Sequence, residues 1–497
     1  MKQTLRSALL MGVMGVLLIA MIDLDNLLNY ANQPIPSYIT KDNMPVTNPI
    51  TDEGATLGRV LFYDKNLSTD NATSCASCHK QEFAFGDTDQ LSEGSNGLTI
   101  RHSMRLVNIR FAEDTLFRWD RTAPTLEAQM TGPIKDFDEM GFSGTGGAPS
   151  FADLIGKLSA IDYYPRLFHA AFGDTVITEE RMQKALAQFV RSIQSFDSKY
   201  DIGRAQVGSD TVPFPNFSNQ ENSGKDLFMK NFTYVVDTLI DSTGMGPSAN
   251  YEEYVVSRRT GGGFNCASCH RPPEFDIDPA SLNNGIITGN PAHGIAYDIA
   301  VTRSPTLRDL IQYDNTVNGG MFHSGEAPGF AFINAHYEFI PPDTNNTNLD
   351  PRLMPGGYPQ FLGMTPKGMS EPEVTSLAAF IRTLAGNDVY TNEKWSNPFD
   401  ENGQLTVIGG TLTTSIERAE PSFQVYPNPC IDQVLVSGNL KQHQLELFNA
   451  SGQLLQTVHL HGELQTVDVS SLAVGMYLLR FTDLKTGVSK VEKILKR

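Results

Sequence analysis

Basic residues and cysteines are both scarce in this sequence, and each scarcity excludes a class of protein. Lys and Arg number 38 against 56 Asp and Glu, which gives a formal net charge of -18 at pH 7. Nucleic-acid binding needs a basic face that neutralises phosphates, so we expect no nucleic-acid partner. Five cysteines, an odd number, do not suggest a disulfide framework.

The apolar run that opens the chain is too short for a membrane span. Lys2 and Arg6 precede the uncharged run Leu9–Ile22, whereas a membrane helix needs roughly 20 apolar residues. This order is typical of a secretory signal peptide, and we predict one at residues 1–22. No small-x-small motif follows it, so the cleavage site and the alternative of an uncleaved anchor stay open.

The length of 497 residues suits two or three domains, and 42 glycines with 28 prolines predict many loops. Residues 30–50 are polar and rich in Pro and Asn, which is typical of a linker. We predict an N-terminal domain at residues 50–203, a second domain at residues 218–386, and a C-terminal domain at residues 422–497.

Helix signals mark the first two domains. Thr178 is a candidate N-cap for a helix with apolar residues at helical spacing, and Ser218 with Glu221 fits a capping box. A further helix is expected around Glu373–Leu384. An insertion, Asn231–Gly263, interrupts the second domain and has no evident role.

The C-terminal domain has a different pattern. Its segments are rich in Leu, Val and aromatic residues, alternate partly, and are separated by turns at Ser451-Gly452 and Val474-Gly475. This pattern predicts a small all-β sandwich. The clearest segments are Gln444–Phe448, Gln453–His459 and Met476–Thr482.

Two copies of one motif carry the chemistry of the chain. The first contains Cys75, Cys78 and His79, and the second contains Cys266, Cys269 and His270. Such paired thiols form thioethers to one haem, and the following histidine becomes an axial iron ligand. A zinc site would need the cysteine pairs to fold onto each other, and a thiol redox pair does not need the histidine. We therefore predict a mainly α protein with two cytochrome c-like haem domains, followed by the β domain.

The chain resembles the bacterial di-haem cytochrome c peroxidase family, which includes MauG. The resemblance covers most of residues 50–385 and rests on short motifs around and between the haem motifs. They are Leu57–Asp64, Leu67-Ser68, Trp119-Asp120, Leu126–Gln129, Gly132–Ile134, Glu139-Met140, Pro165–Phe168, Ala171–Gly173, Pro305–Arg308 and Phe322–Gly325. After Trp-Asp the family usually has Gly and Arg, whereas this chain has Arg121 and Thr122.

The resemblance implies a peroxide site at the first haem, with Gln129, Pro133 and Glu139 in its distal pocket. Glu139 would move a proton between the peroxide oxygens, and Trp119 would relay electrons between the haems. Some relatives block the resting site with a histidine from the loop after the first motif. None occurs between Lys80 and Arg101, so we expect the open, MauG-like arrangement, with His102 as a structural residue.

The resemblance also implies a sixth ligand for the second haem. In this family it stands fourteen residues beyond the histidine of the His-Ser-Gly segment, and counting from His323 leads to Tyr337. A phenolate favours ferric iron and lowers the haem potential. His336 and Met321 are the alternatives. Gly319-Gly320 stand where relatives have a backbone turn that helps to bind calcium between domains, so calcium is a candidate further cofactor.

The last domain resembles a type IX secretion sorting domain, through Tyr426–Pro429, Gly475–Tyr477 and Lys490–Lys496. We therefore expect an exported protein, located in the periplasm or at the cell surface, and the type IX machinery as a partner. The leading hypothesis is a peroxidase that reduces hydrogen peroxide with electrons from a cytochrome or cupredoxin. The alternatives are a MauG-like oxidase of a protein or small molecule, and a non-enzymatic electron carrier. The resemblance also allows a homodimer.

Overall fold

The computed structural model describes residues 24, 26–243, 250–312, 314–338, 340, 343–353, 368–406, 424–438, 440, 443–449, 453–462, 464–484 and 489–497. The predicted signal peptide, residues 1–22, lies outside these residues. The chain divides into two compact units, Met1–Thr411 and Leu412–Arg497. Within the described residues, none of the helices combines the length and the apolar character that crossing a membrane requires.

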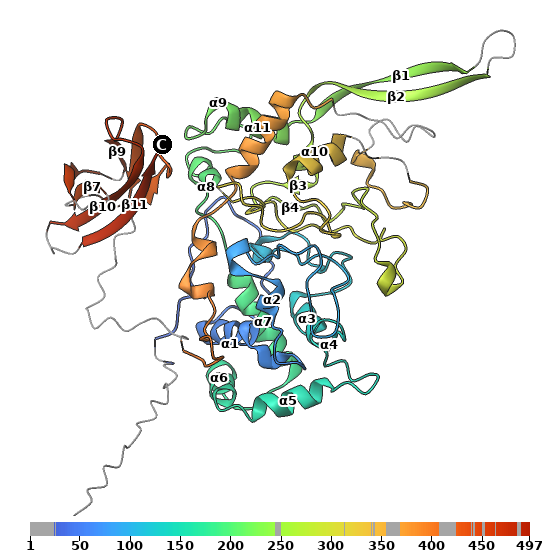
Figure 1. The fold of residues 1–497 in the computed structure, drawn as a ribbon, viewed down its shortest axis with the longest axis vertical. Coiled ribbons are helices and arrows are strands. Elements are labelled where there is room, and N and C mark those ends of the chain that lie inside the picture. Colours follow the sequence, from blue (N-terminus) through green and yellow to red (C-terminus); the bar gives the residue numbers. More distant parts are fainter. Residues whose placement is uncertain are drawn as a thin grey trace, which may run out of the picture. The chain divides into compact units, whose positions relative to one another are not determined.

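The N-terminal half of the first unit is helical (Figure 1). Its helices are α1 (Asp52–Tyr63), α2 (Cys75–Cys78), α3 (Leu126–Met130), α4 (Gly132–Lys135), α5 (Phe151–Ser159), α6 (Tyr163–Phe172) and α7 (Glu179–Ser192). The predicted cap of α7 is confirmed, because Thr178 Oγ1 accepts a hydrogen bond from Arg181 N at 3.2 Å. Helices α1 and α7 pack closely, since a side chain at Gly58 would collide with the carbonyl of Ala185.

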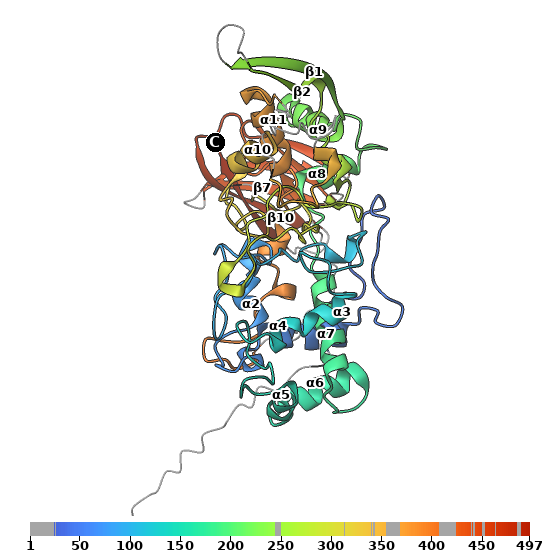
Figure 2. The ribbon, with the colours of Figure 1, turned by 90° about the vertical axis from the view of Figure 1, so that its right-hand side faces the viewer.

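In the second half of this unit, too, a glycine lets two helices pack closely. Its helices are α8 (Lys199–Arg204), α9 (Asn219–Met229), α10 (Phe330–Glu338) and α11 (Glu371–Arg382). The capping box of α9 is confirmed, with Glu221 N bound to Ser218 Oγ at 3.2 Å. Helices α9 and α11 lie side by side (Figures 1 and 2), and Gly224 abuts the carbonyl of Ser376.

Short elements connect these helices. The 3-10 turns are Lys65–Leu67, Gln81–Phe83, Ile109–Phe111, Cys266–Ser268, Pro291–His293, Pro351–Leu353, Asp388–Tyr390 and Glu393–Trp395. Strands β3 (His270–Arg271) and β4 (Asp276–Ile277) pair directly after the second haem motif. The insertion forms an antiparallel hairpin of β1 (Phe232–Thr243) and β2 (Asn250–Gly262), which extends away from the helices of its unit (Figure 1).

The residues around 30–50 are not a free linker, contrary to the sequence-based prediction. Tyr30 is fully buried in the core of the N-terminal half. The same core contains Val389 and Trp395, which follow α11 in the chain. Two hydrogen bonds tie the segment after α11 to the N-terminal half. Tyr30 donates to the carbonyl of Lys394 at 2.6 Å, and Tyr63, at the end of α1, donates to that of Trp395 at 2.7 Å. Proline and asparagine content alone did not reveal this long-range packing.

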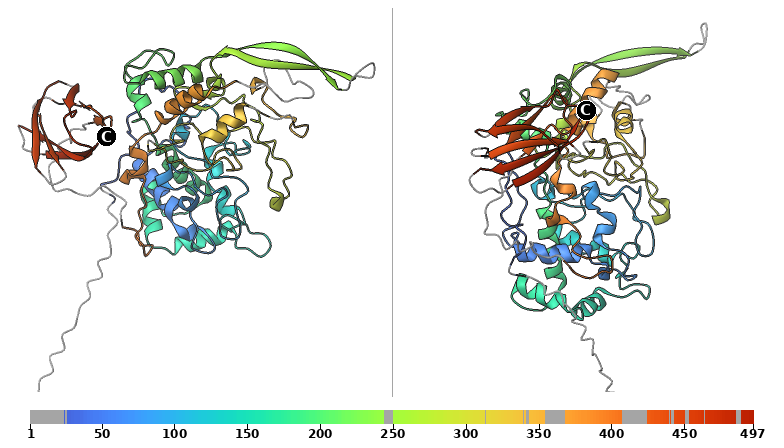
Figure 3. Two further views of the ribbon diagram at one scale, coloured as in Figure 1. Left: turned by 45° about the horizontal axis from the view of Figure 1, so that its top comes forward. Right: turned by 60° about the vertical axis from the view of Figure 1, so that its left-hand side comes forward.

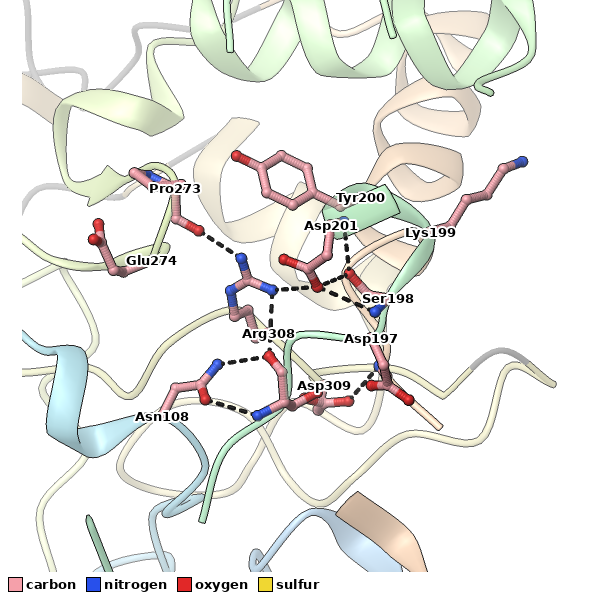
Figure 4. Close-up of polar contacts among 12 residues, drawn as sticks. Asn108, Asp197, Ser198, Lys199, Tyr200, Asp201, Pro273, Glu274, Arg308 and Asp309 are labelled. Atoms are coloured by element: carbon pink, nitrogen blue, oxygen red, sulfur yellow. Dashed lines mark hydrogen bonds and ion pairs between the residues drawn. The ribbon is translucent and has the colours of Figure 1, made fainter. Parts of the chain in front are cut away.

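A buried arginine holds the two halves together (Figure 4). Arg308 has no exposed side-chain surface and lies 2.9 Å from Asp201 Oδ2. Its guanidinium also donates to the carbonyls of Pro273 at 2.8 Å and Ser195 at 3.4 Å. Asn108, from the N-terminal half, donates to the same Ser195 carbonyl at 3.0 Å. The segment between the halves is therefore fixed from both sides.

The second unit consists of strands in its described residues (Figure 3). They are β5 (Gln424–Tyr426), β6 (Gln433–Ser437), β7 (His443–Asn449), β8 (Leu454–Leu460), β9 (Leu464–Asp468), β10 (Gly475–Asp483) and β11 (Ser489–Lys496). One sheet has the order β11-β10-β7-β8 and the other β5-β6-β9. Both supply side chains to one core, in which Cys430 is buried. The predicted helical body and β-rich C-terminal region are confirmed.

Candidate functional site

The first haem motif lines a cavity of about 390 Å³. Cys75 and Cys78 are free thiols, and burial raises their pKa to about 12 and about 11. The Nδ1 of His79 lies 3.0 Å from the carbonyl of Phe85. A carbonyl only accepts, so Nδ1 carries the proton and Nε2 keeps a free lone pair. Burial also lowers the pKa of His79. Two thiols and a neutral, oriented imidazole in one cavity fit a c-type haem.

Gln129, Pro133 and Glu139 line the same cavity. Gln129 belongs to the short helix α3, which Thr125 caps by accepting from Ala128 N at 3.1 Å. An ion pair of 2.5 Å between Glu127 and Arg191 ties this helix to α7. The arginine side chain is 2% exposed, so the pair is shielded from water and fixes α3.

Glu139 has the properties of an acid–base group. Burial, with a smaller contribution from the negative charge of Asp136, raises its pKa to about 7. The positive charge of Arg118, which lines the same cavity, partly offsets this rise. A carboxyl group that titrates near neutral pH can both accept and return a proton.

The second haem motif lines another cavity, of about 170 Å³. Burial, assisted by the positive charge of Arg352, lowers the pKa of His270 to about 4. Its Nδ1 is buried and makes no hydrogen bond to the described residues. This differs from His79, whose ring the carbonyl of Phe85 fixes. The imidazole is neutral, which is the form that binds a metal, and it shares its cavity with Cys266 and Cys269.

The three candidate sixth ligands differ in position. Tyr337 and Met321 line the cavity of His270, whereas His336 does not. The Nε2 of His336 lies 2.9 Å from the carbonyl of Asn284, which commits that nitrogen to the protein. Burial raises the pKa of Tyr337. The phenol therefore stays protonated unless a metal ion binds its oxygen and displaces the proton.

Trp119 lines both cavities. Its Nε1 donates to the carbonyl of His102 at 2.8 Å, and its ring centroid lies 6.3 Å from that of His323. The Nδ1 of His102 lies within 3.1 Å of the carbonyls of Asp89 and Gln90. His102 is thus bound within the wall that the cavities share.

The departure from the family pattern after Trp-Asp has a structural counterpart. Arg121 has a φ of 56°, a left-handed conformation that costs a non-glycine residue roughly 1–2 kcal/mol. Its guanidinium pairs with Asp114 at 2.5 Å and donates to the carbonyls of Ser281 and Asp278. These bonds join the two halves and offset the strain that a glycine would avoid.

Arg105 is a site residue that the sequence did not reveal. It lines both cavities, is 7% exposed, and leaves its Nε without a hydrogen-bond partner in the described residues. Burial lowers its pKa to about 10. No motif surrounds it in the sequence, so only the structure shows its position.

Among the residues that the structure describes, no cluster of acidic side chains accompanies the candidate calcium site at Gly319-Gly320. Gly319 has a φ of 109°, and it abuts the carbonyl of Asp87. In the described ranges, no group of three or more His, Cys, Asp and Glu side chains could hold a metal ion. Calcium at Gly319-Gly320 stays an untested expectation.

Two haem-attachment motifs on one helical unit define a di-haem c-type cytochrome. A model of the di-haem cytochrome c peroxidase family, which includes MauG, matches residues 52–206, and a model of a secretion system C-terminal sorting domain matches residues 424–497. Cytochrome-c peroxidase IdrP1 of Denitromonas iodatirespirans is 31% identical over 357 residues, which are 69% of this chain and 84% of that protein. The methylamine utilization protein MauG of Methylophilus methylotrophus is 26% identical over 354 residues, 69% of this chain and 85% of the relative.

Among solved structures, the fold is similar to that of a MauG-like protein associated with microbial copper homeostasis. The TM-score is 0.53 at 24% identity, over 74% of this chain and 99% of the other. The chain therefore belongs to the di-haem cytochrome c peroxidase and MauG family and carries a C-terminal sorting domain for type IX secretion. The family implies haem c as the cofactor, and the sorting domain indicates export.

Proposed function

We propose that this protein reduces hydrogen peroxide to water with electrons from an external donor protein. One observation carries the proposal: Glu139, with a pKa near 7, lines the same cavity as Cys75, Cys78 and His79. The family's haem would supply the metal that binds the peroxide and the store of electrons. In this proposal Cys75 and Cys78 hold the first haem with His79 as its ligand, and the second motif holds another haem in the same way.

The side chains of the cavity would handle the protons. Glu139 would take a proton from one peroxide oxygen and return it to the other, which leaves as water. Two electrons from the donor and two protons from solvent would convert the remaining oxygen into a second water. Gln129 orients the peroxide by hydrogen bonding. Electrons would come from a small cytochrome or cupredoxin by way of the cavity of the second motif, and Trp119 would relay them because it lines both cavities.

An oxidase that modifies a protein or small molecule is the second candidate, and Tyr337 favours it. Its phenol lines the cavity of His270, and a phenolate ligand would lower the potential of that haem. We propose Tyr337 as the sixth ligand. Tyr337→Phe then changes the spectrum of the second haem and raises its potential, whereas Met321→Leu leaves both as they are. The opposite result would assign the ligand to Met321.

Spectra of the purified protein test the enzyme assignment. We expect a high-spin ferric signal from the first haem in optical and electron paramagnetic resonance spectra, and its loss on adding peroxide. Steady peroxide consumption with a reduced cytochrome supports the peroxidase, and a peroxide reaction without such turnover supports the oxidase. Two low-spin haems that ignore peroxide would leave only an electron carrier.

We further propose that each half of the first unit holds one haem, because each haem motif borders its own hydrophobic core. We also propose that the two C-terminal sheets form a sandwich, because both sheets contribute to one hydrophobic core. The same sorting domain would direct the protein through the type IX machinery to the cell surface. Protease treatment of intact cells distinguishes the surface from the periplasm, since only a surface-located protein is cleaved.

A further inference from the structure

The turn Ser92–Thr99 lies directly behind the segment that carries Glu139. The backbone N–H of Ser95 donates to the carbonyl of Glu139 at 2.7 Å, and that of Asn96 to the carbonyl of Asp138 at 3.1 Å. The Asn96 side chain adds a third bond, to the carbonyl of Phe137 at 2.7 Å. The turn therefore binds three consecutive carbonyls of this segment.

Gly94 permits this close approach. A Cβ built on Gly94 would overlap the carbonyl oxygen of Asp138 and lie 2.7 Å from the Cα and 2.8 Å from the O of Glu139. These are backbone atoms, which cannot rotate away as a flexible side chain can. The φ of Gly94 is not positive, so alanine could adopt its backbone conformation. The contact alone, and not the dihedral angle, requires glycine here.

The turn Ser92–Thr99 is also connected to the first haem motif, through Asp87 and Lys80. Ser92 Oγ lies 2.5 Å from Asp87 Oδ2 and 2.8 Å from the Oγ of Ser103. Asp87 is 1% exposed and accepts from the Lys80 ammonium at 2.6 Å. Lys80 directly follows His79 in the chain. Hydrogen bonds on both sides of the turn thus connect Lys80, the residue after His79, with the segment of Glu139, and the backbone of the turn joins them.

We propose that the turn Ser92–Thr99 is the positioning element of Glu139, and that Gly94 is the residue on which this position depends. The proposal rests on the acid–base role of Glu139 proposed above. It assigns a role to part of the stretch between Lys80 and Arg101, which supports the distal carboxyl group.

The experiment titrates Glu139 in the resting full-length protein by pH-difference infrared spectroscopy. The band of Glu139 is the carboxyl band that Glu139→Gln removes, so the readout does not need turnover. Asp136, Asp138 and Arg118 act on this carboxyl group, His293 lies 3.8 Å from Asp138, and Cys75 and Cys78 lie in the same cavity. The substitutions below change none of these groups.

Gly94→Ala pushes the backbone of Glu139 out of the position in which burial raises the pKa of its carboxyl group. We therefore expect the midpoint of the Glu139 titration to fall by roughly one unit or more, from about 7 towards the ordinary 4.5. The acid limb of the pH–rate profile should shift with it, and kcat should fall roughly 10- to 100-fold with unchanged haem spectra. Gly156→Ala is the matched control, because a Cβ there meets nothing within 4 Å. This control should change neither the midpoint of the Glu139 titration nor the pH–rate profile nor kcat.

Asn96→Ala removes the side-chain hydrogen bond to the carbonyl of Phe137 and adds no atom. This variant tests the positioning role if Gly94→Ala does not fold. We expect a smaller shift in the same direction. Wild-type midpoints and wild-type pH profiles in the folded variants would overturn the positioning role. If the midpoint shifts in Gly94→Ala while the wild-type protein never consumes peroxide, the proposed function fails and the positioning role stands.

Discussion

Replacing Arg308 tests the reasoning about how the two halves are joined. The Arg308→Ala variant removes the positive charge that is paired with Asp201 at 2.9 Å, and it leaves the carbonyls of Pro273 and Ser195 without this donor. The two side chains are 0% and 4% exposed, so water cannot replace the guanidinium. Breaking a buried pair from one side costs about 3–5 kcal/mol. We expect a loss of that size in the free energy of unfolding.

Urea unfolding of the full-length protein, followed by far-ultraviolet circular dichroism, measures the loss. Arg181→Ala is the control, because its pair with Asp174 lies at the surface, and its unfolding midpoint should stay close to that of the wild type. The double variant Arg308→Met/Asp201→Asn should recover part of the loss, since no unpaired charge remains buried. A loss under about 1 kcal/mol in Arg308→Ala, or no recovery in the double variant, would refute the reasoning.

Three further predictions concern the sites, and a fourth concerns a buried carboxyl group outside them. Glu139→Gln should slow peroxide consumption by roughly 10²–10⁴-fold. It should also abolish the fall in rate as the pH drops through about 7, the pKa of the group that must be ionised to accept a proton; an unchanged rate excludes Glu139 from the mechanism. Burial raises the pKa of Asp309 from 3.8 to about 6, so its contribution to stability is present at low pH and lost as the pH rises through about 6. Asp309→Asn should therefore be more stable than the wild type by about 1–3 kcal/mol at about pH 8 but not at about pH 4, by urea unfolding. Trp119→Phe should slow reduction of the first haem by the second in stopped-flow measurements, while both haem spectra stay as they are. Cys266→Ala should weaken attachment of the second haem, which denaturing mass spectrometry detects as protein that has lost one haem.

The sequence predicted what depends on local chemistry. The caps at Thr178 and Ser218 follow from side chains three residues from their partners, and the haem motifs are contiguous. The long-range packing of Tyr30 and the position of Arg105 involve residues without a local pattern, so no spacing rule reveals them. Arg121 was predicted only in part. Its place where the family has glycine pointed to an unusual turn, but not to the ion pair with Asp114 that offsets the strain of its positive φ.

The candidate site also contains residues that the sequence predicted and a choice that only the tertiary structure could inform. Glu139 and Gln129 were inferred from the resemblance, and the structure places both side chains in one cavity with the first haem motif. Spacing from His323 led to Tyr337 as the sixth ligand, with His336 and Met321 as alternatives. The cavity depends on tertiary structure, which shows that Tyr337 and Met321 line it and His336 does not.

The burial of Val389 and Trp395 in the N-terminal core affects the order of events during synthesis. The N-terminal half precedes these residues in the chain, so its interior stays incomplete until the segment after α11 packs against it. Contacts between residues so distant in sequence form slowly and late. We therefore expect Cys75, which packs against this core, and Cys78 to be accessible for haem attachment before that segment docks and to be enclosed afterwards.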